Sequence, residues 1–442
     1  MRLTLPEPKI RLYHDTLKDH DKLERSQLSK DLTKLVNRVE DPLVIALDGG
    51  WGSGKSLFLK CWVGEHLKSE DTPADQFTLY FDAFAEDYLD DPLSALTAAF
   101  AERSDQLTPG EAKLNRLKEA AFRVLPIVVR MGLAASTAVA SEVAGAAVRG
   151  MIESGKKDVE KAAADYWSEE ASRRKAVGDF RDTLIELTEP DEDGSPSKKL
   201  IIVVDELDRC RPDFALELLE ITKHLFSVPG VHFILGVNMS ELANSVRARY
   251  GSGIDAERYL HKFVQVRIPM KPLKSARGEA GEATFYAKIV MDHLRITAEI
   301  RSYVEKYLSM VNYHFDLSLR DVQRIATVVA VCPQGSLRNG EHMHIFAGLA
   351  IISVLRPKWI DEARLGQLSI EQVLRMFKLS ENKNGSPFFA DAFEVWHACL
   401  VKPRVAVQTT LDVTSGFASK FQPHFIPNVL AETIDRFQLP NY

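Results

Sequence analysis

The chain has 442 residues, of which 45% are hydrophobic and 27% charged, and its formal net charge at pH 7 is −6. This is the composition of an ordinary globular protein, and the length predicts two domains, or one large domain with a helical domain attached. The mild negative charge gives no direct sign of nucleic-acid binding, and four widely spaced cysteines without a C-x-x-C pair indicate neither a zinc site nor a disulfide framework.

After a polar arm over residues 1–20, apolar side chains recur at helical spacing over residues 26–39 and predict an amphipathic helix. Residues 43–47 then form an uninterrupted apolar run with the length of one buried strand. The run leads into Gly-Gly-Trp-Gly-Ser-Gly-Lys-Ser at residues 49–56, which matches G-x-x-x-x-G-K-[ST], the phosphate-binding loop. Helical spacing resumes at Leu57, so the motif stands between a strand and a helix, as a nucleotide site requires.

The glycine-rich loop has the chemistry that binds a nucleoside triphosphate. Its glycines can direct successive backbone N–H groups toward one point, and the helix that follows adds free N–H groups and its positive dipole end. Lys55 would reach the β- and γ-phosphates, and the hydroxyl of Ser56 would ligate Mg²⁺. The predicted nucleotide-binding residues of this stretch are Gly50, Trp51, Gly52, Ser53, Gly54, Lys55, Ser56 and Leu57.

A second strand is expected over residues 77–81, followed by a helix that starts at Leu93. Residues 101–179 are predicted to be a helical insertion, in which residues 124–152 are rich in Ala, Gly and Val. A membrane-spanning helix needs about 20 predominantly apolar residues, but the uncharged window here is only residues 131–141, and its side chains are small. We therefore expect a soluble helical insertion that packs on the ATPase or on another subunit, with a membrane anchor as the alternative.

The central strand of the predicted sheet is residues 200–204, a near-continuous β-branched run typical of a parallel strand that is buried on both faces. Asp205 follows at the carboxyl end, where a Walker B aspartate can reach Mg²⁺ directly or through water. Glu206 comes next and could orient and deprotonate the water that attacks the γ-phosphate. The alternative for Asp205 is an ordinary strand-end carboxylate.

Two further strands are expected, at residues 231–237 and 263–268, and the signals become helical from about residue 275. Strands that alternate with helices predict an α/β fold, a doubly wound parallel-sheet P-loop NTPase core with a helical insertion and a helical C-terminal region. The expected domains are residues 1–100 and 180–274 for the ATPase core, 101–179 for the insertion, and 275–442 for a helical lid and C-terminal domain.

Asn238 ends the strand at residues 231–237, and its amide either holds the attacking water or a γ-phosphate oxygen, or caps the helix that starts at Ser240. The charge that develops on the transferred phosphoryl group also calls for an arginine. Arg320, at the start of a predicted helix, is the best candidate, and a surface ion pair is its alternative. The other basic candidates are Arg258, Lys262, Arg267 and Arg324, and a surface ion pair is the alternative for each of them as well.

Taken together, these segments resemble the KAP family of P-loop ATPases, which is similar to the AAA+ and STAND ATPases. The resemblance covers roughly residues 15–330 and rests on the Trp-containing loop, on Phe81-Asp-Ala-Phe84 with Asp87-Tyr88, on Asp205-Glu-Leu-Asp-Arg209 and on Arg258-Tyr-Leu-His-Lys-Phe-Val-Gln265. It implies that Leu23 and Arg25 contact the nucleotide base and that Arg320 senses the γ-phosphate. The chain departs from the family pattern at Glu206, where a second Asp is usual, at Asp82 and Phe84, where Asn and Trp are common, and at Leu319, where Pro is usual.

The predicted activity is Mg²⁺-dependent ATP hydrolysis that switches the position of the lid and insertion. Phage defence or signalling is what the resemblance implies, because several prokaryotic family members are linked to exclusion of phage. The expected catalytic residues are Lys55, Glu206, Asn238 and Arg320, the metal ligands are Ser56 and Asp205, and the cofactors are ATP and Mg²⁺. We also expect a homo-oligomer or a protein partner, and a cytoplasmic location because no signal peptide is evident.

Two alternative functions remain open. One is a nucleotide-gated binding or scaffold protein that hydrolyses little ATP. The other is a small-molecule kinase, which is weakened because Glu206 suits a water nucleophile and no acceptor-binding motif is evident.

Overall fold

The computed structural model describes residues 9–21, 23, 25–72, 76–89, 91–105, 116, 119–120, 175, 177–189, 198–270, 282–312, 315, 317–332, 339–379, 387–401 and 425–436. The chain divides into two compact units. One consists of Ile10–Gly50 and Lys55–Met270, and the other of Lys271–Tyr442, with which Met1–Lys9 and Trp51–Gly54 are grouped. We call them the α/β unit and the helical unit. Residues 124–152 and most of the predicted insertion lie outside the described residues.

The α/β unit is built on five parallel strands in the order β2-β3-β4-β1-β5. Their bounds are Leu43–Asp48 (β1), Phe77–Asp82 (β2), Leu200–Asp205 (β3), Val231–Val237 (β4) and Val266–Pro269 (β5). The parallel α/β core expected from the sequence is therefore confirmed. The predicted start of the last strand at residue 263 is wrong, because the N–H groups of Phe263 and Val264 donate to the carbonyl of Leu260 and continue the preceding turn.

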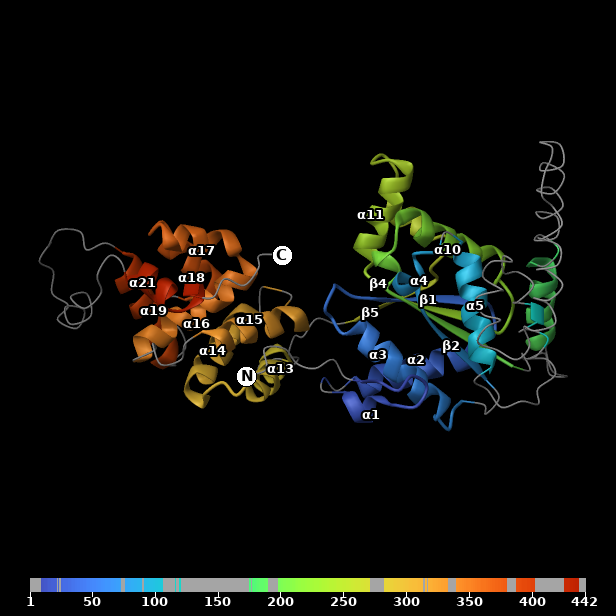
Figure 1. Ribbon diagram of the computed structural model, residues 1–442, viewed down its shortest axis with the longest axis horizontal. Coiled ribbons are helices and arrows are strands. Elements are labelled where there is room, and N and C mark those ends of the chain that lie inside the picture. The colour runs from blue at the N-terminus through green and yellow to red at the C-terminus, as the bar shows by residue number, and fades with distance from the viewer. Residues whose placement is uncertain are drawn as a thin grey trace, which may run out of the picture. The chain divides into compact units, whose positions relative to one another are not determined.

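Helices cover both faces of this sheet (Figure 1). On one face lie α1 (Leu17–His20), α2 (Ser26–Arg38) and α3 (Lys55–Leu67), and on the other α5 (Pro92–Asp105), α10 (Pro212–His224) and α11 (Met239–Tyr250). Shorter elements are α4 (Ala83–Glu86), α12 (Ala256–Leu260) and the 3₁₀ turn η1 (Leu207–Arg209). Because successive strand side chains point to opposite faces, β1 and β3 need apolar residues at almost every position, which explains their uninterrupted apolar runs.

Helix α3, which follows the glycine loop, is fixed on α2 by a buried tryptophan. Trp62 is fully buried, and its indole N–H donates to the carbonyl of Ser29 at 3.3 Å and to the hydroxyl of Thr33 at 3.2 Å. A buried indole without a partner would cost about 1–3 kcal/mol, so these bonds favour one orientation of α3 on α2. These bonds thereby also hold the first turn of α3, which directly follows the loop.

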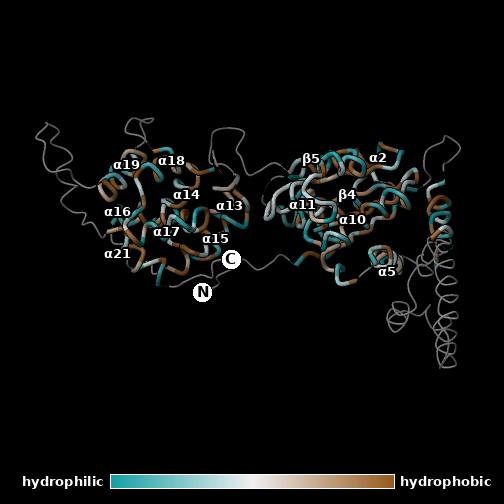
Figure 2. Tube along the Cα trace, turned by 90° about the horizontal axis from the view of Figure 1, so that it is seen from above, coloured by the Kyte–Doolittle hydropathy of each residue, from teal (hydrophilic) through white to brown (hydrophobic). Residues whose placement is uncertain are grey.

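The helical unit contains α13 (Glu282–His293), α14 (Ala298–Asn312), α15 (Leu319–Val331), α16 (Gly340–Leu355), α17 (Pro357–Arg364), α18 (Ile370–Phe377), α19 (Pro387–Leu400) and α21 (Phe425–Glu432). The helical C-terminal region predicted from the sequence is confirmed. Figure 2 shows hydrophobic and hydrophilic residues interleaved along the helices of both units, as amphipathic packing requires. Within the described part of the chain, no helix combines the length and the apolar character needed to cross a membrane.

The core of the helical unit centres on α16, which is buried over most of its length. Trp396 of α19 is fully buried and donates its indole N–H to the hydroxyl of Tyr307 of α14 at 2.9 Å. The same hydroxyl lies 3.1 Å from a ring nitrogen of His344. A hydrogen-bonded network therefore ties three helices together inside an otherwise apolar core.

Candidate nucleotide-binding site

The glycine loop runs from the end of β1 to the start of α3. Gly52 and Gly54 have φ angles of 78° and 84°, in the left-handed region that glycine occupies without a steric penalty. Helix α3 begins at Lys55, so the free N–H groups of its first turn adjoin the loop. This order of strand, loop and helix end is suited to bind a phosphate group.

The side chain of Lys55 is folded over the loop. It is only 8% exposed, and its ammonium group donates to the carbonyl of Gly50 at 3.2 Å and, over a shorter distance, to that of Gly49. Burial lowers the pKa of Lys55, while the nearby carboxylates of Asp208 and Asp205 oppose this shift. The ammonium group thus has backbone partners that phosphate oxygens could replace.

Asp205, at the end of β3, is fully buried. The hydroxyl of Tyr80 donates to its Oδ2 at 2.7 Å, and the backbone N–H of Glu206 donates to its Oδ1 at 2.9 Å. Burial raises the pKa of Asp205, and these hydrogen bonds oppose the shift. Burial, followed by the charge of Asp205, raises the pKa of Tyr80, so the phenol keeps the proton that it donates.

The backbone of β4 passes close to the Asp205 carboxylate. A Cβ atom added at Gly236 would lie 2.5 Å from Oδ1 of Asp205 and 2.5 Å from a methyl carbon of Leu59. Real Cβ atoms do not approach other atoms so closely, so glycine is required here for the strand to pass the carboxylate. No motif in the sequence pointed to this position.

Ser56 brings its hydroxyl to the carboxylates at the end of β3. It donates to Oε1 of Glu206 at 3.3 Å, and it also lowers the pKa of the Asp205 carboxyl. A hydroxyl and a buried carboxylate are oxygen donors of the kind that Mg²⁺ prefers. The donor set therefore fits a magnesium ion that would be held by Ser56 and Asp205.

Glu206 has an unusual backbone conformation, with φ 60° and ψ 23°. Such a left-handed conformation costs a residue other than glycine about 1–3 kcal/mol. Its N–H also lies 3.2 Å from the carbonyl of Gly236, and its Oε2 forms an ion pair with Arg209 at 2.7 Å. The carboxylate is therefore held between the hydroxyl of Ser56 and the guanidinium of Arg209.

Asn238 stands at the end of β4, between the strands that carry the loop and Asp205. Its side-chain oxygen accepts a hydrogen bond from the N–H of Ser240 at 3.2 Å and caps α11. The capping role is thus present, and the catalytic role of the remaining amide N–H₂ group stays a prediction. Asp48, which no sequence motif indicated, accepts from the N–H of Met239 at 2.8 Å and from Nε of Arg267 at 2.8 Å.

The other predicted contacts to nucleotide come from basic side chains outside the loop. Arg25 precedes α2, and its guanidinium donates to the sulfur of Met270 at 3.7 Å. Arg320 is exposed in the first turn of α15 and belongs to the helical unit, so its action on a nucleotide stays a prediction. Arg267 forms an ion pair with Asp48, and an ion pair is the alternative to a catalytic role that the sequence left open for these basic residues.

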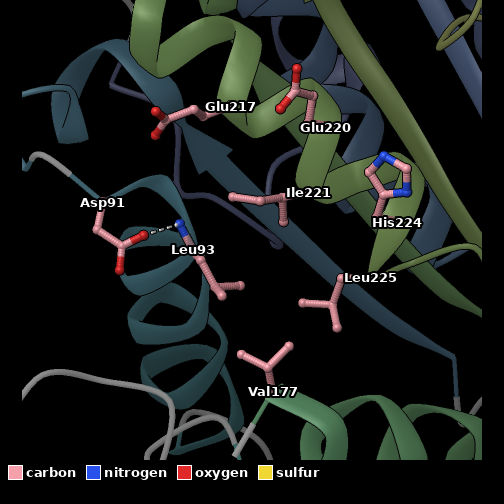
Figure 3. A pocket seen from close by; sticks show the side chains of 8 residues that line it. All are labelled: Asp91, Leu93, Val177, Glu217, Glu220, Ile221, His224 and Leu225. Atoms are coloured by element: carbon pink, nitrogen blue, oxygen red, sulfur yellow. Dashed lines mark hydrogen bonds between the residues drawn. The ribbon is translucent and has the colours of Figure 1, made fainter. Parts of the chain in front are cut away.

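A separate cavity of about 350 Å³ lies between α5, α10 and the helix that carries Val177 (Figure 3). It is lined by Asp91, Leu93, Val177, Glu217, Glu220, Ile221, His224 and Leu225. None of the predicted nucleotide-binding residues lines it. This cavity is therefore a different feature from the phosphate-binding loop.

A parallel sheet with a glycine loop after β1 and buried and half-buried carboxylates after β3 defines a P-loop NTPase. The chain belongs to the KAP family: the family model described as the KAP family P-loop domain matches residues 25–334. The family expected from the sequence is thus confirmed. Among curated proteins, no match is found.

Solved structures of ORC proteins are also similar to this chain. The Aeropyrum pernix ORC2 protein in its ADPNP-ADP complexes has 12% identity and a TM-score of 0.36, covering 93% of this chain and 95% of that chain. Drosophila ORC bound to DNA has 13% identity and a TM-score of 0.38, covering 91% and 86% respectively. These similarities support no assignment of function, because the identities and TM-scores are low.

Proposed function

We propose that this protein is a Mg²⁺-dependent ATPase in which Glu206 is the general base. The observation that carries the proposal is the meeting of two segments far apart in the chain, Ser56 at the start of α3 and Asp205-Glu206 after β3. Ser56 donates to Glu206 at 3.3 Å and lowers the pKa of the neighbouring Asp205 carboxyl. A hydroxyl and carboxylate for the metal and a second carboxylate for a water are the groups that ATP hydrolysis requires beside a phosphate-binding loop.

In the proposed mechanism the loop backbone and Lys55 bind the β- and γ-phosphates, and phosphate oxygens take the place of the carbonyls that Lys55 contacts. Bound Mg²⁺ would neutralise charge on the phosphate oxygens, and Ser56 and Asp205 are the residues that would hold it. Glu206 orients the attacking water and accepts its proton as the water oxygen bonds to the γ-phosphorus. The bond to the β-phosphate oxygen breaks, and ADP and inorganic phosphate leave.

The position of Glu206 favours hydrolysis over the two alternatives. A nucleotide-gated scaffold would need the loop but no group to accept a proton from water. A small-molecule kinase would need its base beside an acceptor hydroxyl. Glu206 instead shares a hydrogen bond with the residue proposed to ligate the metal, where a water at the γ-phosphate would be expected.

We further propose that the nucleotide cycle changes the position of the helical unit, as part of signalling or phage defence. Membership of the KAP family and the presence of a candidate arginine in the helical unit support this proposal. Such a switch would act through further copies of the chain or a protein partner.

The free cysteines at positions 61, 210, 332 and 399 suit a reducing cytoplasm.

Replacement of the loop lysine tests the proposed function directly. Lys55→Ala should abolish ATP binding and phosphate release, because the variant lacks the cation that neutralises the β- and γ-phosphates. Lys30→Ala, which removes an exposed lysine of α2, is the matched control and should behave as the parent. Calorimetric ATP binding with Mg²⁺ and with EDTA, together with a phosphate-release assay, gives both readouts. A folded Lys55→Ala protein with unchanged binding and turnover would rule out the assignment.

A further inference from the structure

Tyr80 connects the edge strand of the sheet to the buried carboxylate of the candidate site. It lies in β2, and its hydroxyl donates to Oδ2 of Asp205 at 2.7 Å. The two residues come from neighbouring strands and point to the same face of the sheet, the face covered by α3. The nucleotide-binding motifs assign no role to Tyr80. Its contact with Asp205 is not evident from the sequence, because 125 positions separate the two residues.

The phenol of Tyr80 is itself held in place. The backbone N–H of Tyr80 donates to the hydroxyl of Tyr13 at 3.1 Å, and the residue is in register with Val203 of β3. The ring is partly buried against the apolar cluster under α3, and the ammonium group of Lys60 lies 5.5 Å from the ring centroid. The hydroxyl is therefore presented to Asp205 from a side chain with little freedom to move.

The Asp205 carboxylate is confined from two sides. The backbone N–H of Glu206 donates to Oδ1, and Gly236 of β4 approaches that oxygen so closely that a Cβ atom would lie 2.5 Å away. Tyr80 donates to the other oxygen, from β2 on the opposite side of β3. With one donor on each oxygen, the carboxylate cannot turn about its Cβ–Cγ bond without losing a hydrogen bond.

We propose that Tyr80 is a positioning residue of the metal site, which fixes the Asp205 carboxylate so that its remaining lone pairs face the hydroxyl of Ser56. This inference rests on the proposed function, because it concerns the metal that accompanies the nucleotide. Tyr80 and the N–H of Glu206 are the donors that orient the carboxylate on either side, whether or not Ser56 ligates a metal.

A purely structural role for Tyr80 predicts a different result. If its hydroxyl only satisfied a buried carboxylate, its removal would lower stability without separating metal binding from nucleotide binding. If Tyr80 positions the carboxylate, removal of its hydroxyl should weaken metal binding and leave the contacts of the loop and Lys55 to the phosphates in place. Removing a partner that orients a metal ligand typically costs about 10–100-fold in metal affinity.

The test compares Tyr80→Phe with Tyr259→Phe in the full chain. Both substitutions remove a phenol hydroxyl that donates to a carboxylate, since Tyr259 donates to Glu220 at 3.4 Å on the exposed side of α12. ADP binding is measured in EDTA, and Mn²⁺ binding to the ADP complex is measured by electron paramagnetic resonance. Mn²⁺ prefers the same oxygen ligands as Mg²⁺. Thermal unfolding checks that each variant is folded.

We expect Tyr80→Phe to weaken Mn²⁺ binding about 10–100-fold, with ADP binding in EDTA equal to that of the parent, and Tyr259→Phe to change neither. Parent-like Mn²⁺ affinity in folded Tyr80→Phe would overturn the inference, as would an equal loss of ADP binding with and without metal. If the parent itself bound no nucleotide, the proposed function would fail, and the inference with it. Failure of the inference alone would leave nucleotide binding by the parent intact, and this distinguishes it from failure of the proposed function.

Discussion

The conformation of Glu206 is the feature of the site that most constrains its chemistry at the level of single residues. Its left-handed backbone, at φ 60°, turns the chain sharply after β3. The turn places its carboxylate beside Ser56, while η1 carries Arg209 back to the same carboxylate. These two contacts hold the carboxylate beside the residue proposed to ligate the metal, where it could act on a water.

Glu206→Gln should leave ATP binding intact and lower turnover about 10²–10⁴-fold, because the amide keeps the shape of the side chain but cannot accept a proton. ATP affinity and the rate of phosphate release are measured on the same preparation. Glu217→Gln, at an exposed position of α10, serves as the control. Turnover within about twofold of the parent would assign the base to another group, and Asp208, which is 7% exposed, would be tested next.

At the scale of strands and helices, the sequence predicted those elements whose local pattern reflects their burial. The apolar runs of β1, β3 and β4 are nearly continuous because both faces of these strands are covered. It also predicted the loop and the strand ends that carry polar residues. It did not predict the contact between Tyr80 and Asp205, because the strand order, with β2 beside β3 and β4 between β3 and β1, is set by long-range packing.

The local sequence pattern also did not reveal the close contact between α16 and α19. A Cβ atom at Gly348 would lie 2.4 Å from a ring carbon of Trp396, a fully buried side chain. The ring cannot simply move away, because its N–H donates to Tyr307 at 2.9 Å. The glycine is therefore needed for packing, although a glycine in a helix is intrinsically unfavourable by about 1 kcal/mol relative to alanine.

Gly348→Ala should destabilise the protein. Overpacking typically costs about 1–3 kcal/mol, and the gain in helix propensity returns up to about 1 kcal/mol, so we expect a net loss of about 1 kcal/mol. Gly178→Ala is the matched control, because a Cβ atom at this helical glycine would meet nothing within 4 Å. Urea unfolding followed by circular dichroism measures both. Equal or greater stability of Gly348→Ala would show that the helices can separate without cost.

At the scale of the whole molecule, the proposed catalytic groups are divided between the two units. Lys55, Asp205 and Glu206 belong to the α/β unit, whereas Trp51–Gly54 of the loop is grouped with the helical unit, in which Arg320 opens a helix. Its place in that helix is well defined, because Ser318 and Asp321 form a capping box in which each side chain accepts the backbone N–H of the other. An arginine so placed could couple the bound nucleotide to the position of the helical unit.

Arg320→Ala should therefore lower turnover about 10²-fold or more, since removal of one donor to a developing negative charge typically has an effect of this size. It should also reduce the protection from hydrogen exchange that ATP confers on residues 317–332. Arg324→Ala provides the comparison, because Arg324 is exposed one turn further along the same helix. If loss of Arg324 has the larger effect, the γ-phosphate is sensed from the second turn. If neither variant alters turnover or protection, α15 does not act on the nucleotide, and a switch of the helical unit would have to depend on other residues.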